Sequence, residues 1–108
     1  MERRRSKRIK IALKAERISG NEKYGVFIED ISESGIQMIT AASKEHMKYS
    51  LGSKVDVRLL LTSGETIDLH CKVRWSYLRI PPERLTDCIG LEIADPPSRF
   101  IEFVHSLR

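Results

Sequence analysis

The sequence predicts a mainly β protein, a small antiparallel β-barrel of six strands with one C-terminal helix. Its 108 residues suffice for a single small domain. Along most of the chain, apolar residues alternate with polar ones, which is the period of strands with one buried face. The alternating segments are short and are separated by turn residues at hairpin-like intervals, and this spacing favours a small closed sheet.

The first three strands are predicted in the N-terminal part of the chain. Residues 9–15 alternate between apolar and mainly charged side chains and form the first strand. A Ser-Gly-Asn turn at residues 19–21 leads to a second strand at residues 24–29. The third strand is expected at residues 35–40, where Ile36 and Met38 share one face.

The clearest hairpin lies in the second half of the chain. Apolar side chains occupy every second position of residues 55–61 and again of residues 67–75, on either side of a Thr-Ser-Gly-Glu turn at residues 62–65. This pattern predicts the fourth and fifth strands. The sixth is expected at residues 88–94, with Ile89, Leu91 and Ile93 on one face.

Three segments depart from the strand period. Residues 43–49 are compatible with one or two helical turns capped by Ser43, and the charged segment 76–87, which contains two prolines, is expected to be a surface loop. A C-terminal helix is predicted at about residues 97–107, with Asp95 or Ser98 as its N-cap. It is expected to cover a sheet face or a barrel mouth with its apolar residues, which are Phe100, Ile101, Phe103, Val104 and Leu107.

The positive charge is concentrated at the N-terminus. The net charge is +4, yet six basic residues and one acidic residue lie within the first ten positions, so the rest of the chain is nearly neutral. We therefore divide the chain into a basic arm, residues 1–8, and a barrel domain, residues 9–108. Such a distribution favours a local anion site over a uniformly basic surface. A basic tail that aids solubility or binds RNA weakly is the alternative.

The sequence offers little that catalysis or metal binding would need. The three histidines are His46, His70 and His105, and His70 and Cys71 are neighbours on a predicted strand, so they point to opposite faces and cannot act together. No known catalytic or zinc-ligand pattern occurs, and Cys71 and Cys88 are expected to be reduced. We therefore expect neither an enzyme nor a metal site.

The chain also lacks recognisable membrane or export signals. No apolar run approaches the roughly 18 residues that span a bilayer, and no apolar segment follows the N-terminal charges as it would in a signal peptide. The expectation is a cytoplasmic protein without membrane insertion.

One segment between the second and third strands combines with the basic arm into a possible ligand site. Asp30, Ser32 and Gly35 form an Asp-x-Ser-x-x-Gly stretch, which on its own is a sound structural turn. Beside arginines it also suits a guanine nucleotide. Arginine can donate to guanine O6 and N7 and to phosphate, a carboxylate can accept from guanine N1 and N2, and a serine with nearby amides can hold phosphate or ribose.

In these segments the chain resembles the PilZ domain family, bacterial receptor domains for cyclic di-GMP. The family pattern is an RxxxR element followed some 20 to 30 residues later by D/N-x-S-x-x-G. Residues 4–8 (Arg-Arg-Ser-Lys-Arg) match the first element and residues 30–35 (Asp-Ile-Ser-Glu-Ser-Gly) match the second. The strand succession, the Val-Arg-Trp at residues 73–75 and the Ile-Gly-Leu at residues 89–91 are also similar to the family's barrel.

The resemblance implies a role for each matching position. Arg4 and Arg8 would grip guanine and phosphate, Asp30 the guanine donors and Ser32 the phosphate, while Gly35 would allow a tight backbone. Further contacts are implied for three other residues, which are Arg3, Arg5 and Trp75. Arg3, ahead of the RxxxR element, is similar to the variety that holds a stacked pair of ligands instead of one, whereas Trp75 could equally belong to the core.

The functional expectation is therefore a stand-alone cyclic di-GMP receptor without a cofactor. Its arm would become ordered on binding, and the receptor would then signal to an unidentified partner protein. DNA is not expected as a binding partner. Two alternatives remain: an adaptor of the same fold that works without ligand, and a small RNA-binding barrel. Against RNA, few aromatic side chains are available for base stacking, because most lie in core-like patterns. Those considered are Tyr24, Tyr49, Trp75, Tyr77 and the three phenylalanines.

Overall fold

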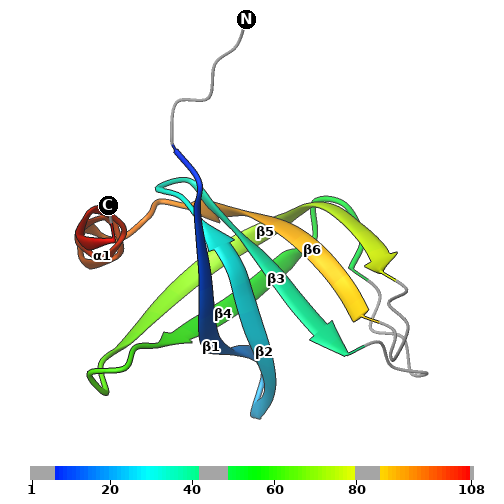
Figure 1. Ribbon diagram of the computed structural model, residues 1–108. Coiled ribbons are helices and arrows are strands. Elements are labelled where there is room, and N and C mark those ends of the chain that lie inside the picture. Colours follow the sequence, from blue (N-terminus) through cyan, green and yellow to red (C-terminus); the bar gives the residue numbers. More distant parts are fainter. Residues whose placement is uncertain (1–6, 42–48, 80–85, 108) are drawn as a thin grey trace, which may run out of the picture.

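The computed structural model is a closed antiparallel β-barrel with one helix at its end (Figure 1). It describes residues 7–41, 49–79 and 86–107. Around the barrel the strands follow the order β1-β2-β3-β6-β5-β4, and every pair is antiparallel. The elements are β1 (Ile9–Ser19), β2 (Glu22–Ile31), β3 (Gly35–Ala41), β4 (Lys54–Leu60), β5 (Thr66–Arg79), β6 (Thr86–Ala94) and α1 (Ser98–Ser106). The predicted fold class is confirmed.

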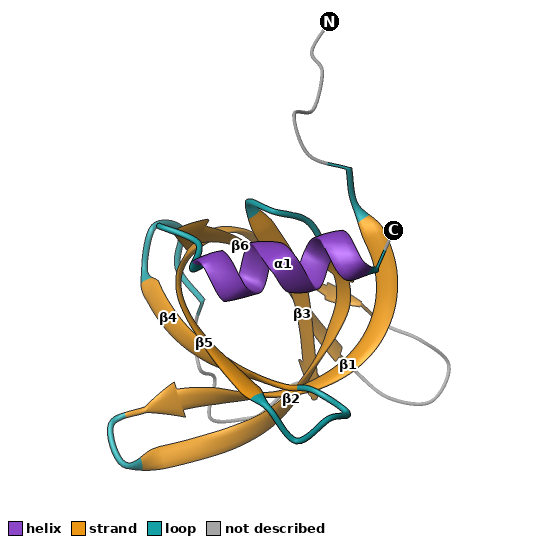
Figure 2. Ribbon diagram, turned by 90° about the vertical axis from the view of Figure 1, so that its left-hand side faces the viewer, coloured by secondary structure: helices purple, strands orange, loops and turns teal. Residues whose placement is uncertain are grey.

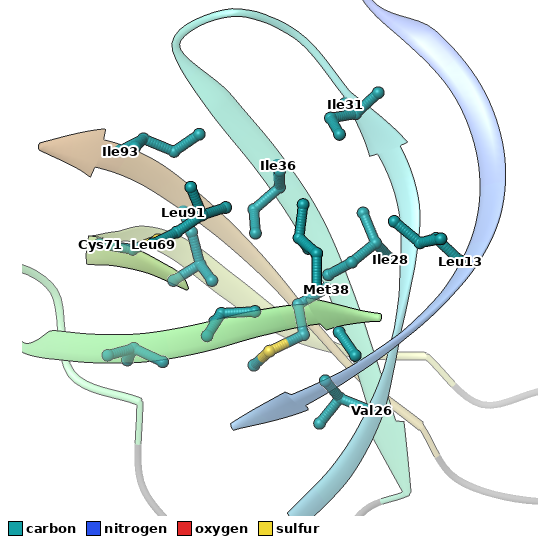
Figure 3. Close-up of a cluster of buried hydrophobic side chains, with 14 of the residues drawn as sticks. Leu13, Val26, Ile28, Ile31, Ile36, Met38, Leu69, Cys71, Leu91 and Ile93 are labelled. Atoms are coloured by element: carbon teal, nitrogen blue, oxygen red, sulfur yellow. The ribbon is translucent and has the colours of Figure 1, made fainter. Parts of the chain in front are cut away.

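The interior of the barrel is filled by the apolar side chains of the alternating strands (Figure 3). Because successive side chains of a strand point to opposite faces, each alternating segment sends one set of side chains inward. The largest fully buried side chains include Ile28, Ile31, Ile36, Met38 and Leu59. These residues come from three different strands, so one core joins the whole barrel.

Helix α1 lies across one end of the barrel (Figure 2). Phe100 and Val104 are fully buried and join the barrel core, as the helical spacing predicted. The predicted N-cap is wrong. Pro97 occupies that position with an extended backbone, ψ 150°, and makes no side-chain hydrogen bond, because a proline side chain has no polar atom.

Several strand boundaries differ from the prediction. The expected loop at residues 76–87 is wrong at both ends, because β5 continues to Arg79 and β6 already begins at Thr86. Pairing drives this extension, since Tyr77 lies opposite Cys88 and Arg79 opposite Thr86. Strands β1 and β2 are likewise longer than expected and meet at a turn of Gly20 and Asn21. The predicted helical turn at residues 43–49 lies mostly outside the described residues.

The cysteines and histidines are arranged as their positions on the strands predicted. Cys71 and Cys88 are buried and are not joined in a disulfide, and burial raises the pKa of Cys71 to about 12, so it stays protonated and unreactive in the folded protein. His70 points outward, with its Nδ1 2.8 Å from Oδ1 of Asp56. Among the described residues, no group of three or more His, Cys, Asp or Glu side chains could hold a metal ion.

No helix in the part of the chain that the structure describes is long and apolar enough to cross a membrane.

Candidate functional site

Two of the site residues predicted on the barrel, Asp30 and Trp75, belong to one row of paired residues on its outer wall. Lys10 pairs with Asp30, Asp30 with Gln37, Gln37 with Gly90, and Gly90 with Trp75, so the row crosses β1, β2, β3, β6 and β5. Gln37 stands between the buried Ile36 and Met38, and paired residues share one face of a sheet. The row therefore faces outward. We call Lys10, Asp30, Gln37, Gly90 and Trp75 the outer row.

Irregular pairing turns two members of this row, Asp30 and Trp75, to the outside. The register shifts between Ile28 and Asp30 on β2, and again between Val73 and Trp75 on β5. Strict alternation from the core residues Ile28 and Val73 would send Asp30 and Trp75 into the core. One extra residue in each strand reverses their direction, which is what a β-bulge does. A third shift, in the pairing of β1 with β2, also borders the row, after Lys10.

Asp30 is the buried acid of the site, and Arg8 is its neighbour. The Asp30 side chain is 10% exposed, and its Oδ1 lies 3.2 Å from Nη1 of Arg8. The two form an ion pair by distance, yet Oδ1 is a buried acceptor without a hydrogen bond in the described part of the chain. A buried acceptor normally has a hydrogen-bond partner. This carboxylate therefore keeps the capacity to accept from a donor on a ligand.

Ser32 holds the turn between β2 and β3. Its backbone N donates to the Gly35 carbonyl at 2.9 Å, and its Oγ lies 3.3 Å from the same oxygen. The same Oγ accepts from the backbone amides of Ser34 and Gly35. The hydroxyl is thus engaged in the turn, which is the structural role that its residue type also predicted. Ser32 fixes the shape of the segment that carries Asp30.

Gly35 is needed because the adjacent strand leaves no space for a side chain. Its φ is not in the left-handed region, whereas Gly20, Gly52 and Gly64 have positive φ values. A Cβ at Gly35 would lie 2.7 Å from the carbonyl oxygen of Leu91 on β6. The tight backbone expected at this position is therefore a close approach of β3 to β6.

Trp75 lies on the surface, and the interpretation that placed it in the core is wrong. The residue is 38% exposed, and its indole covers Gly90, where a Cβ would come within 2.2 Å of the ring. The ring stacks on Tyr77, with centroids 5.4 Å apart and planes inclined by 13°. The bulge after Val73 explains this direction.

Other aromatic side chains also lie outside, against the sequence prediction. Tyr24, Phe27 and Tyr77 are 41%, 50% and 51% exposed, while Phe100 is in the core. Each of these exposed residues occupies an outward position of its strand. The scarcity of exposed aromatics therefore no longer argues against RNA binding.

The basic arm joins the barrel at this same site. Ile9, the first residue of β1, pairs with Ile31 at the end of β2, next to the β2–β3 turn (Figure 1). Arg8 consequently lies beside Asp30 and 3.8 Å from the position of a Cβ on Gly35. The other predicted arginines of the arm, Arg3, Arg4 and Arg5, lie outside the described residues.

Two side-chain contacts near the site were not found from the sequence. The Nε2 of Gln37 donates to Oε1 of Glu29 at 2.6 Å, beside Asp30. Glu33, inside the β2–β3 turn, lies 2.5 Å by its Oε2 from Nε2 of His105 on α1. No pattern in the nearby sequence predicts either contact. The first joins two strands and the second joins a turn to the helix, and only the folded barrel brings these elements together.

Comparisons with known proteins agree with this architecture. The model of a family described as the PilZ domain matches residues 2–102. No curated protein sequence matches the chain. The PilZ domain of YcgR from Escherichia coli, solved with c-di-GMP, has a TM-score of 0.73 at 13% identity, and the match covers 98% of this chain and 88% of that one.

Two larger structures contain a similar barrel. The Bacillus subtilis inhibitor of motility MotI/DgrA has a TM-score of 0.76 at 17% identity, with 96% of this chain and 48% of that chain covered. The K. pneumonia MrkH–c-di-GMP complex has a TM-score of 0.77 at 17% identity, with 99% and 51% covered. The chain thus spans about half the length of these two proteins, and at such identities the likeness concerns the fold.

Proposed function

The chain belongs to the PilZ domain family, and on this basis we propose that it is a receptor for cyclic di-GMP, which it binds along the outer row. The family match covers residues 2–102, and both segments of the family pattern lie inside it. The PilZ domain of YcgR and the MrkH protein were each solved with c-di-GMP. The protein acts as a cytoplasmic receptor and performs no chemistry on the nucleotide.

The state of Asp30 is the observation that carries this proposal. Its side chain is nine-tenths buried beside Arg8, yet its Oδ1 has no hydrogen bond within the described residues. Leaving a buried polar group unsatisfied costs about 1–3 kcal/mol, and more for a charged group. The N1–H and N2–H groups of a guanine would remove this cost, because they are the donors that a carboxylate accepts side by side.

The other residues take complementary roles around this carboxylate. Arg8, with Arg4 of the same RxxxR element, binds phosphate oxygens and the N7–O6 edge of guanine, because a guanidinium can donate two parallel hydrogen bonds. Ser32 shapes the turn and its amides toward a phosphate, and Gly35 lets the backbone approach β6.

The far end of the outer row offers a surface for a purine ring. Trp75 presents an exposed indole three strands away from Asp30, and Tyr77 extends it by stacking. Aromatic rings stack on bases whatever the base is. Arg3 and Arg5 add donors at the arm end, so the row accommodates one ligand molecule or a stacked pair.

Binding also changes the basic arm in this proposal. Six basic residues within ten positions repel one another, and the ligand brings two phosphate charges of opposite sign. Neutralisation therefore favours an arm that folds over the ligand, an order–disorder switch. The resulting surface is what a partner protein recognises.

The energetics are sufficient for such a switch. Micromolar affinity corresponds to about −8 kcal/mol. A few charge-assisted hydrogen bonds at roughly 1.5–3 kcal/mol each reach this value after the cost of ordering the arm.

Isothermal titration calorimetry with cyclic di-GMP tests the proposal. Arg4→Ala and Arg8→Ala should each abolish measurable binding while circular dichroism shows an unchanged fold. Arg58→Ala is the matched control, because Arg58 lies on β4, bonded to Asp68, away from the outer row. Affinity should also fall between about 50 and 300 mM salt, because charge pairing is screened. A wild-type protein that does not bind, or arginine variants that bind normally, would refute the site.

RNA binding is the second candidate, because the exposed Tyr24, Phe27, Trp75 and Tyr77 could stack on bases. Titration of single-stranded RNA into the protein, with and without cyclic di-GMP, distinguishes the two ligands. If neither binds, the ligand-independent adaptor is the remaining interpretation.

A further inference from the structure

Gln37 occupies the centre of the outer row, between Asp30 on β2 and Gly90 on β6. It is the only glutamine of the chain, on a strand where its neighbours Ile36 and Met38 are fully buried. The side chain is half-buried and faces outward with Asp30, its pairing partner. Paired residues of adjacent strands have Cα atoms about 4.5–5.5 Å apart, so a ligand group held by Asp30 lies within reach of Gln37.

The contact with Glu29 fixes which way the Gln37 amide points. Its Nε2 donates to Oε1 of Glu29 at 2.6 Å. An ionised carboxylate can only accept hydrogen bonds, so the NH2 end of the amide must face Glu29. The carbonyl Oε1 of Gln37 is thereby directed elsewhere, and no partner for it occurs in the described part of the chain.

Two acceptors therefore lie on paired residues of the row, Asp30 Oδ1 and Gln37 Oε1, and both lack a hydrogen bond within the described residues. Guanine presents three hydrogens beside its O6, one on N1 and two on N2. A carboxylate accepts the N1 hydrogen and one N2 hydrogen, which leaves the second N2 hydrogen for another acceptor. Adenine presents an acceptor at N1 and no amino group at C2, so two acceptors at this place would repel or miss it.

From this arrangement we propose that Gln37 is a specificity-determining residue whose carbonyl oxygen accepts a hydrogen bond from the 2-amino group of the guanine that Asp30 holds. The inference rests on the proposed cyclic di-GMP function. Glu29 is the positioning residue, because it acts only through the orientation of the Gln37 amide.

The test compares two ligands that differ only in the 2-amino group. Cyclic di-GMP and cyclic di-inosine monophosphate are titrated calorimetrically into the wild-type protein and into Gln37→Met, which keeps the length of the side chain without its amide. Wild type should prefer cyclic di-GMP. Gln37→Met should weaken cyclic di-GMP binding about tenfold and leave the inosine ligand unchanged, since a hydrogen bond contributes up to about this factor.

Controls separate specificity from folding. Gln37→Leu serves as a second variant, and Thr40→Val, another polar-to-apolar change on β3 outside the row, should change neither affinity. If Gln37→Met weakens both ligands equally, the residue is structural, and if it weakens neither, the residue takes no part in binding; either result means that the inference is wrong. If the wild-type protein binds neither ligand, the proposed function itself fails. If it binds cyclic di-GMP and the preference is unaffected by the variants, only the role of Gln37 fails.

Discussion

Two turns of the barrel connect antiparallel neighbours in very different ways. In the β4–β5 turn, the Leu61 amide donates to the Glu65 carbonyl and the Gly64 amide donates to the Leu61 carbonyl. Gly64 adopts a φ of 98°. Its tip is exposed to solvent. The β2–β3 turn instead follows a buried Asp30, contains a buried Ser32, and leaves one carboxylate oxygen without a hydrogen bond among the described residues.

This difference in burial and hydrogen bonding indicates that the β4–β5 turn serves folding alone. Water satisfies the exposed groups of the β4–β5 turn, and its backbone follows ordinary turn chemistry. Burial of an incompletely bonded carboxylate in the β2–β3 turn lowers stability, so stability does not explain its presence. The donors of the proposed ligand would explain it.

Both turns are nevertheless attached to the same helix. Glu65 accepts two hydrogen bonds of 2.7 Å from Arg99, near the start of α1, and Glu33 lies 2.5 Å from His105, near its end. The helix therefore spans the end of the barrel between the two turns. The contrast between the turns can be tested by equivalent changes in each.

The largest contrast is expected between Asp30→Ala and Glu65→Gln. Both changes remove one carboxylate charge from a residue near a turn. Asp30→Ala should weaken cyclic di-GMP binding at least about 100-fold, because it removes both acceptor oxygens opposite the guanine N–H groups. Its stability should change by no more than about 1 kcal/mol, because Oδ1 makes no hydrogen bond within the described residues.

Calorimetric titration and urea unfolding measure these two quantities. Glu65→Gln should bind like the wild-type protein. Wild-type binding by Asp30→Ala would remove the functional distinction between the turns.

An intermediate contrast concerns the glycines. Gly35→Ala should lower the free energy of unfolding by about 2 kcal/mol, because its Cβ would lie 2.7 Å from a backbone oxygen of β6. Gly64→Ala should cost about 1 kcal/mol through its positive φ, since nothing lies within 4 Å of its Cβ. Gly25→Ala, in an open extended position, is the control and should be nearly neutral. Urea unfolding gives all three values, and an equal loss at Gly25 and Gly35 would contradict the close approach.

The smallest effect is a pH dependence at the β4–β5 turn. The hydrogen bond from Arg99 holds the pKa of the Glu65 carboxyl below its ordinary value of 4.5. A lowered pKa means that the ion pair stabilises the fold above pH 4.5 and is lost as the pH falls through the pKa of the folded state. Glu65→Gln should therefore lower Tm by about a degree or two at pH 7 and have no effect near pH 3. A difference that persists in acid would show that the ion pair is not its cause.

The strands could be predicted from the sequence because the burial of one strand face requires apolar and polar residues to alternate. Val55, Val57 and Leu59 alternate into the core as predicted, and so do Phe100 and Val104 at helical spacing. These are local patterns that a residue and its near neighbours define.

The outward direction of Asp30 and Trp75 could not be predicted in the same way. Each depends on a register shift with a neighbouring strand, after Ile28 and after Val73, and alternation alone sends both residues inward. The contacts of Gln37 and His105 depend likewise on pairings that are distant in the sequence. The resemblance to PilZ domains indicated Asp30 and Ser32, but it carried no information about Gln37.

Closure of the sheet limits how another protein can recognise this domain. Each of the six strands is hydrogen-bonded to a neighbour on either side, so within the described residues no strand is open along its whole edge, where an extended peptide could add. A binding partner would therefore recognise mainly side-chain shape and charge. Those are the properties that an anionic dinucleotide on the outer wall would alter most directly.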